Sequence, residues 1–124
     1  MSTQRKTRQR SAIRNTIQVA GRPLSPQEVL ELAQVEVPQL GQATVYRSLN
    51  SLVEEGVIRA VELPGESARY EPADLAHHHH FICTACKKVY DLEGCMLKHE
   101  LKLPKGFTVV SHEITLSGTC PACK

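Results

Sequence analysis

Residues 41–56 have the sequence GQATVYRSLNSLVEEG, and this stretch decides the fold of the N-terminal half of the chain. Its apolar residues recur at the spacing of one buried helix face, at Val45, Leu49, Leu52 and Val53. Gly56 follows as the left-handed residue that commonly ends a helix. The remaining face is polar and able to bond to bases and phosphates, with Gln42, Thr44, Tyr46, Arg47 and Asn50. We therefore expect a helix over residues 41–55, either a surface helix or one that recognises DNA.

Two further helices are expected before this stretch. Residues 7–19 place Ile13 and Ile17 on one face, and Gly21 ends that pattern. Ser25-Pro26-Gln27-Glu28 is a capping box with proline at the first helical position, so a second helix should begin there and run to about residue 34. Six basic residues precede the first acidic residue, Glu28: Arg5, Lys6, Arg8, Arg10, Arg14 and Arg22. Such a segment can neutralise phosphates, although a solvated terminus has the same composition.

A hairpin is expected after the third helix. Residues 57–63 alternate and are rich in β-branched side chains, residues 64–67 form a turn, and residues 68–71 resume an extended pattern. Three helices followed by a hairpin is the order of a winged helix-turn-helix, with the third helix as recognition helix and residues 64–67 as wing tip. This context favours DNA recognition, in which Tyr46 contacts thymine methyl groups and Arg47 reaches a guanine edge or a phosphate.

The second half of the chain has mixed patterns. Residues 72–76 are expected to form a hinge. Strands are expected at 81–82 and 88–92, a helix at 96–103, and a longer strand at 107–116. The predicted fold class is therefore α+β, with a winged-helix domain over 1–71 and a small metal-binding domain over 77–124.

Four of the five cysteines form two close pairs, Cys83/Cys86 and Cys120/Cys123. Cysteines in a chain without an export signal are more often metal ligands than disulfides. Four thiolates at this spacing build a closed tetrahedral site, which suits structural Zn²⁺. A redox dithiol pair and an iron–sulfur or rubredoxin-like iron site are the alternatives.

Four consecutive histidines, residues 77–80, precede the first cysteine pair. Alternate residues of a strand share a face, so His78 and His80 would point one way and His77 and His79 the other. Two histidines on one face can chelate a transition metal when other donors complete the shell. The available donors are Glu71, Asp91, Cys95, His99, Glu100 and His112. A solvated histidine loop is the alternative.

Composition limits the remaining possibilities. A chain of 124 residues with 41% hydrophobic and 23% charged residues and a net charge of +2 fits one ordinary domain or two very small ones. Small units usually need a metal or a partner subunit for stability. The chain lacks an apolar run of membrane-spanning length and a signal sequence, so we expect it in the cytoplasm. It shows no catalytic signature and no catalytic residue is assigned; Cys95 could be a redox thiol, a buried apolar residue or a metal ligand.

The order of QATVYR at 42–47, the histidine cluster and the two cysteine pairs closely resembles the ferric uptake regulator family over nearly the whole chain. The resemblance implies a metal- or peroxide-responsive repressor and not an enzyme. It implies a homodimer with an N-terminal winged helix and a C-terminal α/β dimerisation domain, bound to palindromic operator DNA. A zinc-stapled thiol or redox protein, or an interaction module without DNA binding, is the alternative.

The resemblance also implies roles for individual residues. The structural zinc ligands would be Cys83, Cys86, Cys120 and Cys123. An exchangeable Zn²⁺, Fe²⁺ or Mn²⁺ would be held by Glu71, His78, His80 and Asp91, and would fix the hinge. A further site, found in some members, matches His77, His79 and His112. The DNA-facing residues would be Arg10, Gln42, Thr44, Tyr46 and Arg47.

Two departures from the family pattern stand out. Pro23 lies where the family frequently has a histidine ligand from the DNA-binding domain. The segment after Asp91 is a few residues short, so the acidic ligand of the further site lacks a counterpart, and Cys95 or Glu100 could replace it.

Overall fold

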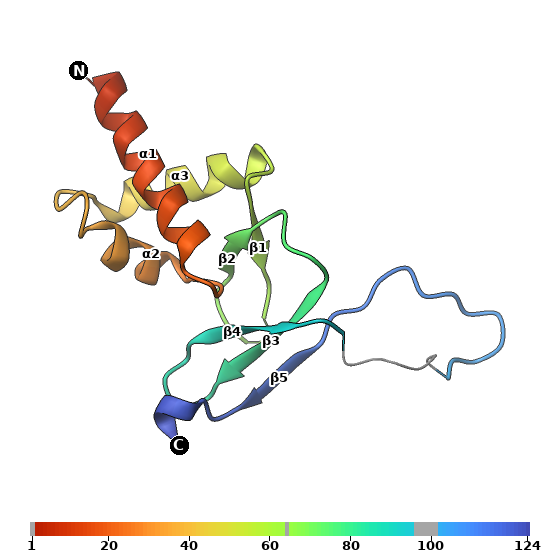
Figure 1. The fold of residues 1–124 in the computed structure, drawn as a ribbon. Helices are drawn as coiled ribbons and strands as arrows, with labels where there is room; N and C mark the ends of the chain where they lie inside the picture. Colours follow the sequence, from red (N-terminus) through yellow and green to blue (C-terminus); the bar gives the residue numbers. More distant parts are fainter. Residues whose placement is uncertain (1, 64, 96–101) are drawn as a thin grey trace. The chain divides into compact units, whose positions relative to one another are not determined.

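The computed structural model describes the backbone of residues 2–63, 65–95 and 102–124, and side chains from residue 5 onward. The chain divides into two compact units, residues 1–75 and residues 76–124 (Figure 1). Each unit has its own sheet, two-stranded in the first and three-stranded in the second. The predicted α+β class is confirmed. Among the described residues, no helix has both the length and the apolar character needed to cross a membrane.

The first unit consists of three helices and a hairpin (Figure 1). Helix α1 spans Ser2–Val19, α2 spans Pro26–Ala33 and α3 spans Gln42–Glu54. Strands β1 (Ile58–Val61) and β2 (Arg69–Pro72) pair antiparallel, with Arg59 opposite Glu71. This is the order predicted from the sequence, except that α1 begins five residues earlier than expected. Of the predicted wing tip, Pro64 lies outside the described residues.

The core of this unit forms where the three helices meet the hairpin. Ile13, Ile17 and Leu49 are fully buried, as the helical spacing predicted. Val45 and Leu52 are 1% exposed and belong to the same cluster. The placement of Val53 in the buried stripe is wrong, because its side chain is 37% exposed. At 3.6 residues per turn Val53 lies about 80° around the helix from Val45, at the edge of the buried face.

Local signals position the helices as predicted. The Ser25 hydroxyl accepts the Glu28 N–H at 3.1 Å, and the Ser25 N–H donates to the Glu28 carboxylate at 3.0 Å, which completes the capping box at the start of α2. Gly56 has a φ of 77°, the left-handed conformation expected after α3. Helix α3 packs with Val45 and Leu49 inward and leaves its polar face outward.

The second unit is a small sheet of order β4-β3-β5. Its strands are β3 (His78–Cys83), β4 (Val89–Glu93) and β5 (Thr115–Gly118), followed by a short 3₁₀ helix, η1 (Pro121–Cys123). Strand β3 pairs antiparallel with β4 and parallel with β5. Residues 96–101 lie outside the described residues, so the helix predicted over 96–103 is not described except at its last two residues, which are not helical.

The strand predicted over 107–116 is wrong over most of its length, since only residues 115–118 form β5. Phe107, Val109 and Val110 are 66%, 49% and 97% exposed. Their apolar, β-branched composition suggested a strand, but a strand also needs a neighbour to accept its hydrogen bonds, and β3 pairs only with the end of this segment.

Candidate metal centres and nucleic-acid interface

The four paired cysteines come together at one end of the second unit. Cys83 ends β3, Cys86 lies in the turn to β4, Cys120 directly precedes η1, and Cys123 is the last residue of η1. Their sulfurs all lie within 4.8 Å of one another. The Sγ atoms of Cys86 and Cys120 are 3.8 Å apart. Metal–sulfur bonds of about 2.3 Å in a tetrahedral site place sulfurs about 3.8 Å apart, so the spacing fits Zn²⁺.

The electrostatics of this cluster favour a cation. The backbone N–H groups of Cys86 and Cys120 each donate to Cys83 Sγ at 3.4 Å and lower the pKa of Cys83 to about 6. A hydrogen bond from the Tyr90 hydroxyl lowers the pKa of Cys120. The neighbouring sulfurs, Cys120 first, raise the pKa of Cys123 to about 12. Without a cation the Cys123 thiol therefore keeps its proton, whereas a divalent ion would stabilise the thiolates.

A second cluster joins His78, His80 and Asp91 on one face of β3 and β4. His80 and Asp91 are partners in the β3–β4 register. Asp91 Oδ1 lies 3.3 Å from His78 Nε2 and 3.5 Å from His80 Nε2. His78 Nδ1 lies 2.7 Å from the Ala76 carbonyl oxygen, which places the ring proton on Nδ1 and leaves Nε2 as a metal donor. The donor set of two imidazoles and a carboxylate suits a divalent transition metal.

The fourth predicted ligand of that cluster, Glu71, belongs to the first unit, as does Pro23, which replaces the family's frequent histidine. Glu71 lies on β2, where Arg59 Nε donates to its carboxylate at 2.6 Å across the hairpin. The Glu71 side chain is fully buried. Pro23, at the position of the family's frequent histidine, is also fully buried and has no atom that binds a metal. Glu71 is thus the first unit's remaining donor among the residues that the resemblance singled out.

A third cluster lies on the opposite face of β3. His77, His79, Cys95 and His112 each offer a donor atom, and these atoms lie within 4.8 Å of one another. The histidines of β3 are therefore divided between two clusters, as strand alternation predicted. Burial, and then the neighbouring histidines, lower the pKa of His79. Of the candidate replacements for the missing acidic ligand, the structure brings Cys95 into this cluster, while Glu100 lies outside the described residues.

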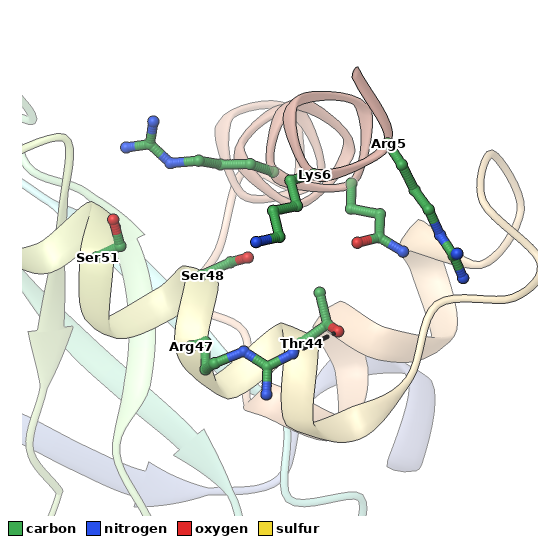
Figure 2. Close-up of a pocket in the computed structure, with 8 residues that line it drawn as sticks. Arg5, Lys6, Thr44, Arg47, Ser48 and Ser51 are labelled. Atoms are coloured by element: carbon green, nitrogen blue, oxygen red, sulfur yellow. Dashed lines mark hydrogen bonds between the residues drawn. The ribbon is translucent and has the colours of Figure 1, made fainter. Parts of the chain in front are cut away.

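A cleft of about 440 Å³ lies between α1 and α3. Figure 2 shows Arg5 and Lys6 entering from α1, and Thr44, Arg47 and Ser48 from α3. Arg47 Nη2 donates to Thr44 Oγ1 at 3.1 Å. Among the described residues, the lining includes four cationic side chains and no carboxylate: Arg5, Lys6, Gln9, Arg10, Thr44, Arg47, Ser48 and Ser51. The cleft suits an anionic backbone such as that of DNA.

Arg10 has a carboxylate partner at the edge of this cleft. Its guanidinium pairs with Glu55, whose carboxylate also accepts the Ser51 hydroxyl at 3.0 Å. The side chains of Arg10 and Glu55 are 40% and 49% exposed, so solvent reaches the pair. The Arg10 hydrogen bond lowers the pKa of Glu55, as does that of Ser51. Arg10 is thus held by an acidic residue that competes with an external anion.

The structure places the sequence-predicted DNA residues in two groups. Arg10, Thr44 and Arg47 line the cleft, whereas Gln42 and Tyr46 do not, although Tyr46 is 45% exposed on α3. Three of the lining residues were not among those predicted to bind DNA: Gln9, Ser48 and Ser51. A signal for two of them was present, because Thr44, Arg47, Ser48 and Ser51 have the spacing of one helix face.

Comparison with known proteins gives a consistent result. Residues 2–117 match the profile of the ferric uptake regulator family. The ferric uptake regulation protein of Campylobacter jejuni subsp. jejuni is 32% identical over 123 residues, which cover 94% of this chain and 78% of that protein. The corresponding protein of Bordetella parapertussis is 33% identical over 106 residues, which cover 83% of this chain and 76% of the relative.

Two solved structures extend the comparison. The Helicobacter pylori ferric uptake regulator, described as having three functional metal-binding sites, superposes with a TM-score of 0.68 at 25% identity, covering 93% of this chain and 79% of the other. A zinc uptake regulator from M. tuberculosis gives a TM-score of 0.54 at 29% identity, covering 97% of this chain and 95% of the other.

Proposed function

This chain belongs to the ferric uptake regulator family, whose members are metal-responsive, dimeric regulators that bind operator DNA, and we propose that it is a homodimeric, metal-dependent transcriptional repressor of the cytoplasm. One observation carries the proposal. The same chain combines a winged-helix unit, a cationic cleft between α1 and α3 of that unit, and separate clusters of metal donors. The genes under its control would serve metal homeostasis or the response to peroxide.

The DNA contact would use α3 and the N-terminal part of α1. Helix α3 exposes Tyr46 and leaves its polar face free of the core, so it can enter the major groove with Gln42, Thr44 and Arg47 toward the base edges. The cleft would take a phosphate of the DNA backbone. Arg5, Lys6 and Arg10 of α1 supply its positive charge. Two such helices in a homodimer would match the half-sites of a palindromic operator.

The four-cysteine cluster would hold structural Zn²⁺. The sulfur spacing fits the ion. A divalent cation would also stabilise the thiolate of Cys123, whose pKa is raised to about 12, beside the Cys83 thiol, whose pKa is lowered to about 6. Such an ion links the end of the chain to the β3–β4 turn and supplies folding free energy. This role predicts that zinc stays bound when the regulatory ion is removed.

The regulatory ion would bind His78, His80 and Asp91, with Glu71 as the ligand from the DNA-binding unit. This requires that residues 72–76 act as a hinge. An ion that binds one pose of the two units better than others shifts the population toward that pose by the difference in affinity. Because Arg59 already pairs with the Glu71 carboxylate, the ion would have to bind this carboxylate together with Arg59 or displace Arg59 from it.

The test compares metal-dependent binding to a duplex selected from a random DNA library in the presence of Mn²⁺ or Zn²⁺. The variant is His80→Ala combined with Asp91→Ala. The matched control is Glu36→Ala, which removes an exposed carboxylate of the first unit that lies outside residues 72–76 and belongs to none of the donor clusters. We expect the double variant to remain dimeric and zinc-bound at the cysteines but to lose metal-dependent DNA binding. Unchanged metal dependence in the double variant refutes the assignment.

A further inference from the structure

Glu71 is the residue through which the proposed regulatory ion would act on the DNA-binding unit, because Pro23 replaces the histidine that the family frequently supplies. The Glu71 carboxylate is already held by a cation of the chain itself, the guanidinium of Arg59. We propose that Arg59 is the counter-ion of Glu71 in the metal-free protein and competes with the regulatory ion for this carboxylate, so that it sets the free metal concentration at which the protein responds. This inference rests on the proposed function, in which Glu71 binds that ion.

The hairpin of the first unit brings the two side chains together. Arg59 on β1 and Glu71 on β2 are directly opposed in the antiparallel register, and side chains in such positions lie on the same face of a sheet. Arg59 Nε donates to Glu71 Oε2 at 2.6 Å, which is a short, charge-assisted hydrogen bond. Because both residues belong to the paired strands of one hairpin, this pair forms without any ligand from the second unit.

The two partners differ in their exposure to solvent. The Glu71 side chain is 0% exposed, whereas the Arg59 side chain is 46% exposed. A buried carboxylate that loses its cation is strongly destabilising, so Glu71 needs a positive partner with and without the ion. A half-exposed arginine can turn its charged head into water, where the charge is solvated. Arg59 is therefore the partner that moves away when an ion arrives, and it returns when the ion leaves.

The ion and Arg59 oppose each other at Glu71. A divalent ion and a guanidinium on the same carboxylate are like charges a few ångströms apart, and they repel strongly where solvent does not reach. Each of the two cations lowers the affinity of the carboxylate for the other, and this coupling is reciprocal. Arg59 thus stabilises the metal-free unit and weakens metal binding through one contact. The protein releases its ion at a higher free metal concentration than a chain with an uncharged residue at position 59.

A purely structural pair has a different signature. If Glu71 never exchanges Arg59 for the ion, loss of Arg59 lowers the stability of the first unit and leaves the affinity for the ion unchanged. Competition predicts that loss of Arg59 lowers the stability of the metal-free protein and raises the affinity for the ion. Metal affinity is therefore the measurement that separates the two roles.

The experiment is a Mn²⁺ titration of the full-length protein with one zinc per chain at the four cysteines, followed by the electron paramagnetic resonance signal of free Mn²⁺. Mn²⁺ prefers oxygen donors, so it reports on the carboxylate-containing site. Arg59→Gln removes the competing charge and should bind Mn²⁺ about 5- to 150-fold more tightly than the wild type. Its metal-free form should unfold at a lower denaturant concentration, and Mn²⁺ should raise that concentration more than it does for the wild type.

Two variants serve as comparisons. Arg59→Lys keeps a positive charge opposite Glu71 but replaces the planar guanidinium by a single point charge, so it should tighten Mn²⁺ binding less than Arg59→Gln does. If Arg59→Gln does not fold, Arg59→Lys decides the outcome. The matched control is Arg14→Gln, which removes an exposed arginine of α1, outside the hairpin, and changes the net charge equally. This control should leave the Mn²⁺ affinity unchanged.

Glu71→Gln separates this inference from the proposed function. It should weaken Mn²⁺ binding, and Arg59→Gln should have no further effect in its presence. If Glu71→Gln leaves Mn²⁺ binding unchanged, Glu71 is not a ligand, and the proposed regulatory site is wrong together with this inference. If Glu71→Gln weakens binding but neither Arg59→Gln nor Arg59→Lys tightens it, the proposed ligand stands and competition by Arg59 is refuted.

Discussion

The pair between Arg10 and Glu55 gives the sharpest test of the proposed DNA contact. In the structure Arg10 lines the cationic cleft, yet its guanidinium pairs with the Glu55 carboxylate at the end of α3. Glu55→Gln removes this competing charge. Since the pair is exposed to solvent, its contribution to folding is small, about 0–1 kcal/mol, and the protein should remain folded. We expect Arg10 to become available for one more phosphate contact.

The size of the effect follows from counterion release. One additional phosphate contact makes the slope of log K against log salt more negative by about 0.9, which corresponds to a gain of about 8-fold per subunit at 0.1 M salt and about 4-fold at 0.2 M. Fluorescence anisotropy with a labelled random-sequence duplex over a salt series measures both quantities. A random duplex is sufficient because the contact does not depend on base sequence.

Glu54→Gln is the matched control. Glu54 is the neighbouring exposed carboxylate at the end of α3, so its removal changes the net charge equally. We expect a smaller gain in affinity and no added phosphate contact for this variant. If Glu55→Gln and Glu54→Gln have the same salt slope, or if Glu55→Gln binds DNA more weakly than the wild type, Arg10 does not contact phosphate as argued.

Three other predictions concern stability and the zinc site. Glu28→Ala removes the carboxylate half of the capping box of α2 and the partner of Arg69, whose side chain is only 9% exposed, and should cost about 2–4 kcal/mol in chemical denaturation. Glu28→Gln should cost less because its amide oxygen can still accept the Ser25 N–H, and equal costs would contradict this. Leu49→Ala should lower the free energy of unfolding by about 2–5 kcal/mol because Leu49 is fully buried. Val53→Ala should lower it much less because Val53 is 37% exposed, and a comparable loss would contradict that exposure. The pKa of Cys123 is raised to about 12, so zinc binding at neutral pH must displace the proton of that thiol. The apparent zinc affinity, measured by competition with a colourimetric chelator, should rise by about tenfold per pH unit above pH 7, and an affinity that does not change with pH would contradict this.

The sequence predicted the first unit well because its signals are local. The Ser25–Glu28 capping box, the glycine at 56 and the helical spacing of Ile13 and Ile17 each depend on residues within one or two turns. The errors arose where tertiary contacts decide. Val53 lies at the margin of a helical face, and only the packing of α3 determines that it is exposed. The residues of 107–114 have strand-like composition, but strand formation depends on a partner that β3 does not provide.

The metal clusters were predictable in part. Alternation along a strand was enough to separate His78 and His80 from His77 and His79. Whether Cys95 or Glu100 joins the second pair could not be decided, because that depends on the turn at Gly94 and on the parallel register that brings His112 near β3. The residues of this cluster that meet across the sheet are 16 to 35 positions apart in the chain, so no local sequence pattern could predict their contact.

The proposed function requires that an exchangeable ion, separate from the zinc proposed for the four cysteines, controls operator binding. The most direct measurement strips that ion with a chelator while elemental analysis confirms that one zinc per chain remains, and then determines operator affinity before and after the ion is restored. We expect affinity to fall by about 5- to 150-fold on stripping and to recover fully on restoration. Equal affinity of the stripped and restored protein, with the cysteine zinc intact, contradicts the account.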